Sequence, residues 1–349
     1  MSSRARDGER GIALLLVILV VTLVAVVVVE FTYSTEVDAH VTRNALNATQ
    51  AHYLARSGAA LGQVALRVDA EQKALSGAPA VETLTDTWAR PFPPLAIDGG
   101  FGFASFTISD ETSKFNLNAL AVPGGGNPTL LEMRKQLLQA ILGSVGADEN
   151  LAFALVDWVD FDDMSDRESG AERQYYQRRD PPYEPRNGLL LGFDELAMVR
   201  GFETLTRTQW TALRRIVTVL PTTDLRINLN TAPGELLNAI GSSVNAAGLG
   251  DTIVRARETR SVMSIAEMAQ LPGMSALPPL VRAAFDVRST YFRIHAVGGA
   301  GDARRGVAVT VERPRGGTRL RVVDWSEEAA SIALTSSGSS AGIPGSSLP

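Results

Sequence analysis

An apolar run from Ile12 to Val29, broken only by Thr22, is the strongest feature of the hydrophobic pattern. As a helix rising about 1.5 Å per residue, it spans about 27 Å, close to the hydrocarbon thickness of a bilayer. The run passes directly into Glu30, without the small-residue cleavage site of a secretory signal. Arginines precede it, and positive charge favours the cytoplasmic side. The pattern therefore predicts one retained membrane helix, and an ordinary uncleaved anchor would fit it equally well.

The helical pattern continues beyond the membrane segment. Between Val37 and Val68 there is no proline, and glycine occurs only at Gly58 and Gly62. Small and bulky apolar residues recur there at a helical spacing of three or four. The small set is Ala45, Ala48, Ala51 and Ala55, and the bulky set is Leu54, Leu61, Val64 and Val68. The sequence thus predicts one long helix, apolar in its first half and amphipathic in its second half.

The rest of the chain consists of one strand-like segment, a helical block and a cluster of strand-like segments. Phe101–Ser109 is aromatic-rich and roughly alternating, which is typical of a strand. Residues 128–287 carry mostly helical patterns. The segments YFRIHAVG, RGVAVTVERP and TRLRVVDWS follow, separated by glycine-bearing loops. One strand before the helical block and three after it predict an α+β fold, in which the long N-terminal helix packs on an antiparallel sheet with a large inserted all-α domain.

Composition narrows the function classes. The 349 residues carry a formal net charge of −5, whereas a protein that binds polyanions normally has a basic surplus. The chain has no cysteine, which excludes disulfides, thiolate catalysis and zinc–cysteine sites. Its three histidines, His40, His52 and His295, are scattered, and no P-loop, G-x-S-x-G, H-E-x-x-H or dinucleotide fingerprint occurs. We therefore expect no enzyme and no nucleic-acid partner.

A basic-x-Asn-Leu-Asn motif occurs twice, in KFNLNAL and RINLNTAP. Asn118 and Asn230 suit helix starts, because an Asn side chain can accept from free backbone N–H groups. Thr231 is an equally good cap in the second copy, with Pro233 in the first turn. The segments INLNTAPGELLNAI and SIAEMAQLPGM also resemble helix-hairpin-helix modules of DNA-uptake proteins. A membrane-anchored DNA-binding protein is therefore the alternative hypothesis.

Carboxylates are concentrated after the helical segment LAFALVDWV. The cluster consists of Asp157, Asp160, Asp162, Asp163, Asp166, Glu168 and Glu172. Oxygen ligands suit Ca²⁺ better than zinc, although the spacing does not match an EF-hand loop. The alternative is a solvated acidic loop that pairs with nearby arginines.

The leader junction resembles a known signal. Gly11 is followed at once by the apolar run at Ile12, as in the class III signal of type IV pilins and pseudopilins, which is cut after the glycine. Pilins carry Glu at the fifth mature position, where this chain has Leu16, a departure shared with one pseudopilin family. Further matching stretches are ISDETSKFNLNAL, LVDWVDFDD, GAERQYY, PPYEPRNGLLLGFDELAMVRGF and RINLNTAPGELL. Over nearly its whole length the chain resembles the type II secretion system protein K family of minor pseudopilins.

This resemblance implies a pilin-like fold and a domain organisation. The expected parts are a class III leader (1–11), a transmembrane part of the N-terminal helix (12–29), a pilin-like domain with spine helix and first strand (30–110), an inserted helical domain (111–288), the C-terminal strands of the sheet (289–326) and a flexible tail (327–349).

The resemblance also implies the function and the partners. The expected protein is anchored once in the inner membrane, with its C-terminal domain in the periplasm, and is processed at Gly11 and Ile12 by prepilin peptidase, with methylation of the new terminus. It is expected to cap the pseudopilus tip with minor pseudopilins I and J and other type II secretion components, promoting assembly for export across the outer membrane. Relatives bind calcium in the helical domain, for which the expected ligands here are Asp160, Asp162, Glu168 and Glu172.

Overall fold

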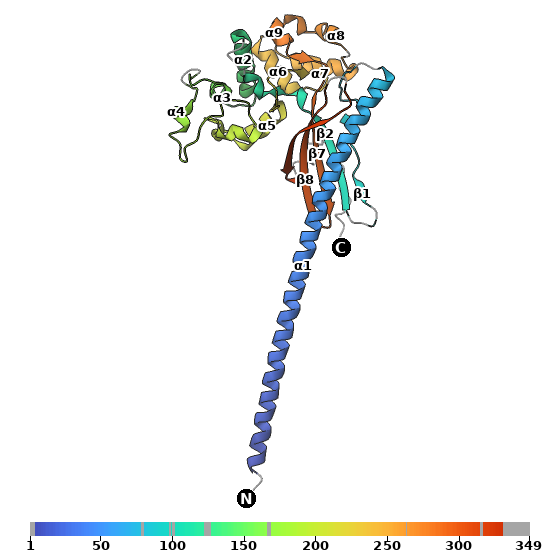
Figure 1. The fold of residues 1–349 in the computed structure, drawn as a ribbon, viewed down its shortest axis with the longest axis vertical. Helices are drawn as coiled ribbons and strands as arrows, with labels where there is room; N and C mark the ends of the chain where they lie inside the picture. Colours follow the sequence, from blue (N-terminus) through green and yellow to red (C-terminus); the bar gives the residue numbers. More distant parts are fainter. Residues whose placement is uncertain are drawn as a thin grey trace.

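The computed structural model describes residues 4–77, 80–97, 99, 102–121, 127–165, 169–262, 264–314 and 317–330. A single helix, α1 (Arg4–Ser76), extends for 73 residues. Its N-terminal half stands free of the rest of the chain, and its C-terminal half lies along a sheet (Figure 1). Strand β9 (Arg321–Glu328) extends into the predicted flexible tail (327–349), and residues 331–349 of that tail lie outside the described residues.

The sheet has five antiparallel strands in the order β1-β2-β7-β8-β9. Their bounds are β1 (Leu95–Ile97), β2 (Gly102–Asp110), β7 (Tyr291–Ala300), β8 (Ala303–Glu312) and β9 (Arg321–Glu328). Strand β2 pairs directly with β7, although the whole helical part of the chain separates them in sequence. The predicted α+β fold is thereby confirmed: a pilin-like helix on an antiparallel sheet, with helices inserted between two neighbouring strands.

Small residues allow α1 to lie close against the sheet. Ala51, Ala55 and Ala59 are fully buried on the face of α1 that lies against the sheet. A Cβ atom at Gly62 would lie only 2.5 Å from Cγ2 of Ile294, so the close approach requires glycine there. Of the bulky set, Leu61, Val64 and Val68 are exposed on the opposite side, whereas Leu54 is half-buried. From Ala51 onward the small stripe is therefore the packing face, and most of the bulky stripe points to solvent.

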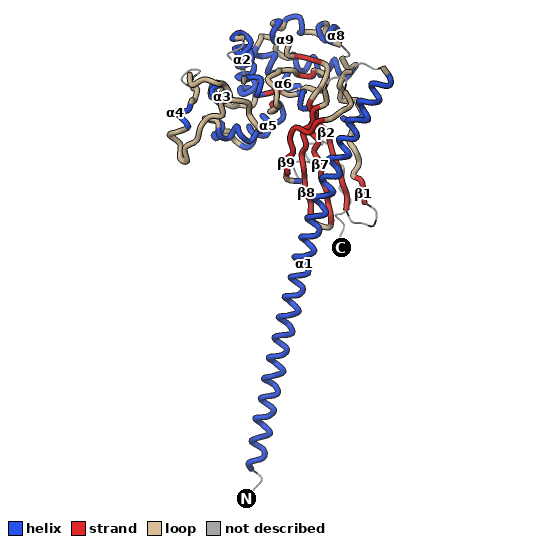
Figure 2. The backbone as a smooth tube through the Cα atoms, in the orientation of Figure 1, coloured by secondary structure: helices blue, strands red, loops and turns tan. Residues whose placement is uncertain are grey.

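The inserted part consists mainly of helices and loops, with a few short strands (Figure 2). Its α-helices are α2 (Pro128–Ser144), α3 (Leu151–Val159), α4 (Arg173–Tyr176), α5 (Arg207–Ile216), α6 (Gly234–Ser243), α7 (Leu249–Thr259), α8 (Ile265–Ala269) and α9 (Pro279–Arg282). Its strands are β3 (Phe115–Asn116), β4 (Val217–Thr218), β5 (Ile227–Asn228) and β6 (Phe285–Asp286). The 3₁₀ turns are η1 (Thr87–Ala89), η2 (Glu111–Ser113), η3 (Leu117–Leu120), η5 (Phe193–Met198), η6 (Phe202–Thr204) and η7 (Met274–Ala276).

These bounds refine the helical pattern in two places. The segment beginning at Phe193 has a helical pattern but forms a 3₁₀ turn. The segment RTQWTALRRIVTVL leaves the helix at Val217 and forms β4, which pairs in parallel with β3. β-Branched valine and threonine favour the extended pairing over a further helical turn.

The two Asn-Leu-Asn motifs begin two similar units of the inserted part. Each unit starts with a short strand, β3 or β5, and ends with a short strand parallel to it, β4 or β6. Each also contains a glycine of positive φ before a 3₁₀ turn, Gly201 (φ 83°) in the first and Gly273 (φ 87°) in the second. The inserted part therefore contains two units with the same order of these features, each beginning at a copy of the repeated motif.

The prediction that Asn118 and Asn230 act as N-caps is wrong. The cap of η3 is Asn116, whose side chain accepts from the Asn118 N–H. Helix α6 has no side-chain cap at its N-terminus. The Thr231 hydroxyl donates instead to Asp110 at 2.5 Å. The second Asn of each motif binds the backbone of a distant loop, and this long-range contact replaces the local one.

Candidate cation site and membrane helix

Helix α3 delivers two carboxylates to one place. The helix is apolar and buried along its whole length, so Asp157 is fully buried with it. Asp160 follows as the C-cap residue, and its N–H donates to the Val156 carbonyl at 2.9 Å. Glu172 approaches from the segment before α4. Asp157, Asp160 and Glu172 each place one oxygen within 4.8 Å of the others.

Glu172 is the member that most needs a positive partner. Its side chain is buried, and neither carboxylate oxygen has a hydrogen-bond partner among the described residues. Burial, and after it the charges of Asp157, Asp160, Asp163 and Asp162, raise the pKa of Glu172 to about 8. A buried carboxylate without donors is costly, and hard oxygen donors suit Ca²⁺. The residues present therefore fit a divalent cation.

The surrounding segment is closely packed around Asp157. The Ser165 hydroxyl donates to Oδ2 of Asp157 at 3.1 Å, which ties the acidic loop back to α3. A Cβ atom at Gly170 would lie 2.1 Å from the same oxygen, so only glycine fits there. Arg200 donates from Nη1 to the Gly170 carbonyl at 2.7 Å and fixes that approach.

The structure brings together two of the four expected ligands. Asp160 and Glu172 lie in the group, whereas Asp162 is exposed and its Oδ1 accepts from the Met164 N–H at 2.8 Å. Glu168 lies outside the described residues. Asp157 belongs to the group, although the sequence interpretation did not include it among the expected ligands. An acidic residue inside the otherwise apolar LAFALVDWV was the available signal.

A second acidic group, Asp69, Glu82 and Asp86, is of a different kind. Lys73 Nζ lies 3.1 Å from Asp69, 2.8 Å from Glu82 and 2.6 Å from Asp86. Arg313 contacts both Asp69 and Glu82. The two basic side chains already offset most of the negative charge, so this group fastens the segment after α1 rather than offering a cation site.

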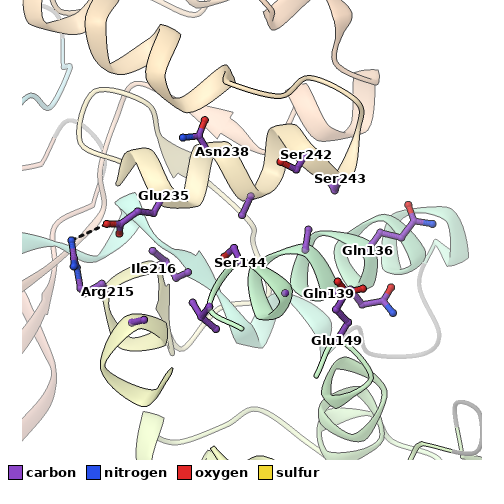
Figure 3. Close-up of a pocket in the computed structure, with 15 residues that line it drawn as sticks. Gln136, Gln139, Ser144, Glu149, Arg215, Ile216, Glu235, Asn238, Ser242 and Ser243 are labelled. Atoms are coloured by element: carbon purple, nitrogen blue, oxygen red, sulfur yellow. Dashed lines mark hydrogen bonds and ion pairs between the residues drawn. The ribbon is translucent and has the colours of Figure 1, made fainter. Parts of the chain in front are cut away.

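An open groove of about 860 Å³ lies between α2, α5 and α6 (Figure 3). It is lined by Ile216, by amide and hydroxyl side chains and by Glu149. Arg215 and Glu235 close one end with an ion pair of 3.1 Å. Neither histidine nor cysteine occurs among the residues that line the groove. His295 is elsewhere, on β7, with Nδ1 3.0 Å from Glu328.

The N-terminal half of α1 is built for an apolar environment. The helix from Ile12 onward is long and apolar enough to cross a membrane, with a mean hydropathy of 3.6 in its most apolar window and no part of that window buried. Gly11 lies within α1, and Ile12 is 67% exposed. Leu16, also exposed, occupies the position where pilins carry Glu.

Comparisons with known proteins agree along most of the chain. The family model described as "Type II secretion system (T2SS), protein K" matches residues 113–222. Type II secretion system protein K of Pseudomonas aeruginosa is 28% identical over 322 residues, covering 91% of this chain and 92% of the relative. The protein of the same name from Aeromonas hydrophila is 28% identical and covers 87% and 92%. A putative protein K from Escherichia coli K12 is 30% identical and covers 64% and 66%.

A similar fold occurs in the crystal structure of the GspK–GspI–GspJ complex from enterotoxigenic Escherichia coli. One chain of it has a TM-score of 0.66 and 21% identity, covering 82% of this chain and 99% of that one. The long helix, the sheet and the inserted helices thus form the fold class of that chain. Within this class, the resemblance to the type II secretion system protein K family is confirmed, and the chain is a relative of that minor pseudopilin.

Proposed function

We propose that this chain caps the tip of a type II secretion pseudopilus together with minor pseudopilins I and J, and promotes pseudopilus assembly for export across the outer membrane. The observation that carries the proposal is the position of the inserted helices. They lie beyond the end of the sheet that is farthest from the N-terminus of α1 (Figure 1). A subunit with this bulk at its upper end obstructs stacking of a further subunit above it. The chain acts as an assembly subunit without an enzymatic role.

The sequence at the membrane end of α1 also supports a position at the pseudopilus tip. In pilins a buried Glu is thought to meet the terminal amine of a neighbouring subunit, and this chain has Leu16 there. A subunit at the tip has no neighbour above it for such a pair. The helix Ile12–Val29 anchors the chain in the inner membrane, and the head stands in the periplasm. Prepilin peptidase cuts between Gly11 and Ile12, and the new amine is methylated.

The exposed face of α1 gives neighbouring subunits a surface to pack on. Tyr53, Leu61, Val64 and Val68 are apolar or aromatic and exposed on the helix opposite the sheet. Exposed apolar side chains along one face of a helix suit a contact with another protein. The faces of minor pseudopilins I and J that meet it would bury it, since the proposed complex joins long helices side by side.

The test is co-purification of the full chain, in detergent, with affinity-tagged minor pseudopilins I and J. We expect one complex of all three. Val64→Asp places a charge on the exposed stripe and should weaken retention at least tenfold, whereas Gln63→Asp beside it should not. A chain that elutes alone under conditions in which I and J remain together contradicts the proposal.

The contacts of two arginines close to the segment SIAEMAQLPGM disfavour the DNA-binding alternative. Arg257 Nη1 donates to the carbonyls of Leu229 at 2.9 Å and Ala232 at 2.7 Å. Arg260 pairs with Glu267 at 2.6 Å. Arg257 thus holds the backbone of the inserted part, and Arg260 is engaged in a surface ion pair. Duplex DNA should therefore show no shift with this chain at low salt.

We further propose that Asp157, Asp160 and Glu172 hold a structural calcium ion. Glu172 carries this part of the proposal, because its buried oxygens have no hydrogen-bond partner among the described residues. The ion would supply positive charge where the carboxylates repel one another. It would fix the loop after α3 against the segment before α4.

A further inference from the structure

The sheet and the inserted part have separate hydrophobic cores. One core of the described residues extends through the inserted part from Phe115 to Val287 and includes Val81 from the segment after α1. The other lies between α1 and the sheet, around Phe106 and Phe292. Both Asn-Leu-Asn units contribute to the first core, and α2 of one unit packs against α6 of the other. The inserted part is therefore a single packed body beside the sheet.

A layer of buried polar side chains lies where the chain passes between the sheet and the inserted part. The chain leaves the sheet at Asp110, the last residue of β2, and returns to it at Tyr291, the first residue of β7. Parts of a chain that meet through polar groups move relative to each other more readily than parts with a large apolar interface. The orientation of the inserted part therefore depends on the bonds within this layer, whose buried members are Asp110, Glu111, Thr112, Thr218, Asn228, Thr231 and Ser289.

Asp110 bonds to the inserted part and to the segment that returns to the sheet. Its Oδ2 accepts from the hydroxyls of Thr231 and Ser289, each at 2.5 Å, and from Asn228 Nδ2 at 3.3 Å. Its Oδ1 accepts from the Thr112 N–H at 2.8 Å. Burial raises the pKa of this carboxyl, and the bonds from Ser289, Thr231 and Thr112 oppose that shift. Four donors thus converge on one carboxylate, two of them from the second Asn-Leu-Asn unit.

Glu111 makes a second connection, to the first Asn-Leu-Asn unit. Its Oε2 accepts from the Thr218 hydroxyl on β4 at 2.7 Å. Its Oε1 accepts from the Ser109 hydroxyl on β2 at 3.3 Å and from Lys114 Nζ at 2.7 Å. Two neighbouring residues at the end of β2 therefore hold the inserted part at two points, one in each unit.

The segment after α1 also reaches this layer. The Glu82 N–H donates to the Val287 carbonyl at 3.1 Å, and the Glu82 carbonyl accepts from Asn228 Nδ2 at 3.0 Å. Neither bond involves the carboxylate of Asp110 or of Glu111. These two bonds can therefore keep the inserted part attached when the bonds of one carboxylate are lost.

We infer that Asp110 and Glu111 set the orientation of the inserted part relative to the sheet, and that the polar layer becomes a hinge when either carboxylate loses its bond to that part. Two attachment points on one packed body prevent a rotation that a single point permits. Hydrogen bonds to an ionised group are also stronger than those between neutral groups, so each carboxylate is an effective anchor. The inserted part would move as a whole, because its own core does not depend on either anchor.

The experiment measures distances between pairs of spin labels in the full chain in detergent. The chain has no cysteine, so three exposed positions can be labelled specifically: Arg305→Cys on β8, Thr211→Cys on α5 and Glu258→Cys on α7. The pairs that include position 305 report the distance from the sheet to each unit. The pair of positions 211 and 258 reports the distance within the inserted part.

The variants that test the anchors are Thr218→Val and Thr231→Val, which each remove one hydroxyl without a change of size. The matched control is Thr107→Val on β2, because Thr107 Oγ1 is buried and has no hydrogen-bond partner among the described residues. We expect each anchor variant to broaden both sheet-to-unit distance distributions about twofold, and the control to leave them unchanged. The distribution within the inserted part should stay narrow in every variant.

Three results would overturn the inference. Narrow sheet-to-unit distributions in both anchor variants would show that other contacts set the orientation. Equal broadening within the inserted part would place the loosening inside its core and not at the hinge. Equal broadening by Thr107→Val would show that the sheet itself, and not the anchors, has been disturbed.

Discussion

Asn118 holds the backbone of Leu190 from both sides. Its Nδ2 donates to the Leu190 carbonyl at 3.0 Å, and its Oδ1 accepts from the Leu190 N–H at 2.7 Å. Asn230 forms the same pair of bonds with Val262: its Nδ2 donates to the Val262 carbonyl at 2.9 Å, and its Oδ1 accepts from the Val262 N–H at 2.8 Å. In both Asn motifs, therefore, a buried side-chain amide forms the two backbone hydrogen bonds that a neighbouring strand would otherwise provide to the loop.

Replacing this amide should be among the costliest polar changes in the chain. Asn118→Ala leaves the buried N–H and carbonyl of Leu190 without partners and also removes the donor to Leu220, 2.8 Å away. We expect a loss of about 2–4 kcal/mol in the free energy of unfolding, measured with urea. Asn127→Ala is the control, because that exposed side chain caps α2 with one bond to Thr129 and should cost about 1 kcal/mol. Equal losses for the two variants would contradict the role of Asn118 in holding the Leu190 backbone.

Adding one methyl group at Gly62 should disrupt the packing of α1 on the sheet. Gly62→Ala places a Cβ atom 2.5 Å from Cγ2 of Ile294 and 3.3 Å from the Phe106 ring. Both neighbours belong to the core between helix and sheet, so we expect a loss of about 1–3 kcal/mol, seen as a lower Tm. Gly192→Ala is the matched control, since nothing lies within 4 Å of its added Cβ. An unchanged Tm for Gly62→Ala would show that the helix can move away from the sheet.

These contacts show which parts of the fold the sequence can predict. The alanine stripe of α1 was recognisable because helical spacing is a local property, and its neighbour Gly62 marks the close approach. The role of Asn118 was not recognisable, since its partner Leu190 lies 72 residues away and an N-cap explains the same short motif. In the candidate site, Asp160 and Glu172 were expected ligands because the acidic cluster can be recognised in the sequence and the family resemblance implies a calcium site there. Asp157 was not predicted, because its place beside Glu172 depends on the tertiary structure.

Stability at low pH should depend on Glu111, at the junction of sheet and inserted part. Burial alone would raise its pKa, but the charges of Lys114 and Arg293 and the hydrogen bonds from Lys114 and Thr218 lower the pKa to about 2. A depressed carboxyl pKa stabilises the fold above the unfolded value of 4.5, and this contribution is lost as the pH falls from about 4.5 to 2. It amounts to about 3 kcal/mol.

The measurement is urea unfolding of the full chain at several pH values. Glu111→Gln should lower stability at pH 7 and flatten the decline between about pH 4.5 and 2. Glu132→Gln is a suitable control, because Glu132 is a more exposed carboxylate, paired with Lys135 at 3.0 Å. Parallel pH profiles for the unchanged chain and Glu111→Gln would show that this carboxylate does not drive the acid transition.

Calcium should raise the melting temperature of the full chain in detergent, and chelator should lower it. A ligand that binds only the folded state stabilises it by about 2.7 kcal/mol at a hundredfold excess over Kd. Glu172→Gln should abolish most of this effect, whereas Asp162→Asn, which changes an exposed carboxylate outside the group, should preserve it. The same response to sodium chloride at matched ionic strength would assign the gain to screening.

Processing at the membrane end should yield a chain that begins at Ile12. Gly11 directly precedes the apolar run, and a bulky side chain there would occupy the small-residue site of prepilin peptidase. Gly11→Leu should therefore leave the chain uncut. Leu16→Glu is the companion variant, since it restores the residue of pilins beyond the cut and should leave cleavage intact. N-terminal sequencing and intact mass from a strain with active peptidase decide between these products, and the mass also reports methylation. A chain that still begins at Met1, or one cut beyond Val29, would contradict the retained-helix mechanism, because in the first case no mature amine forms and in the second the anchor is lost.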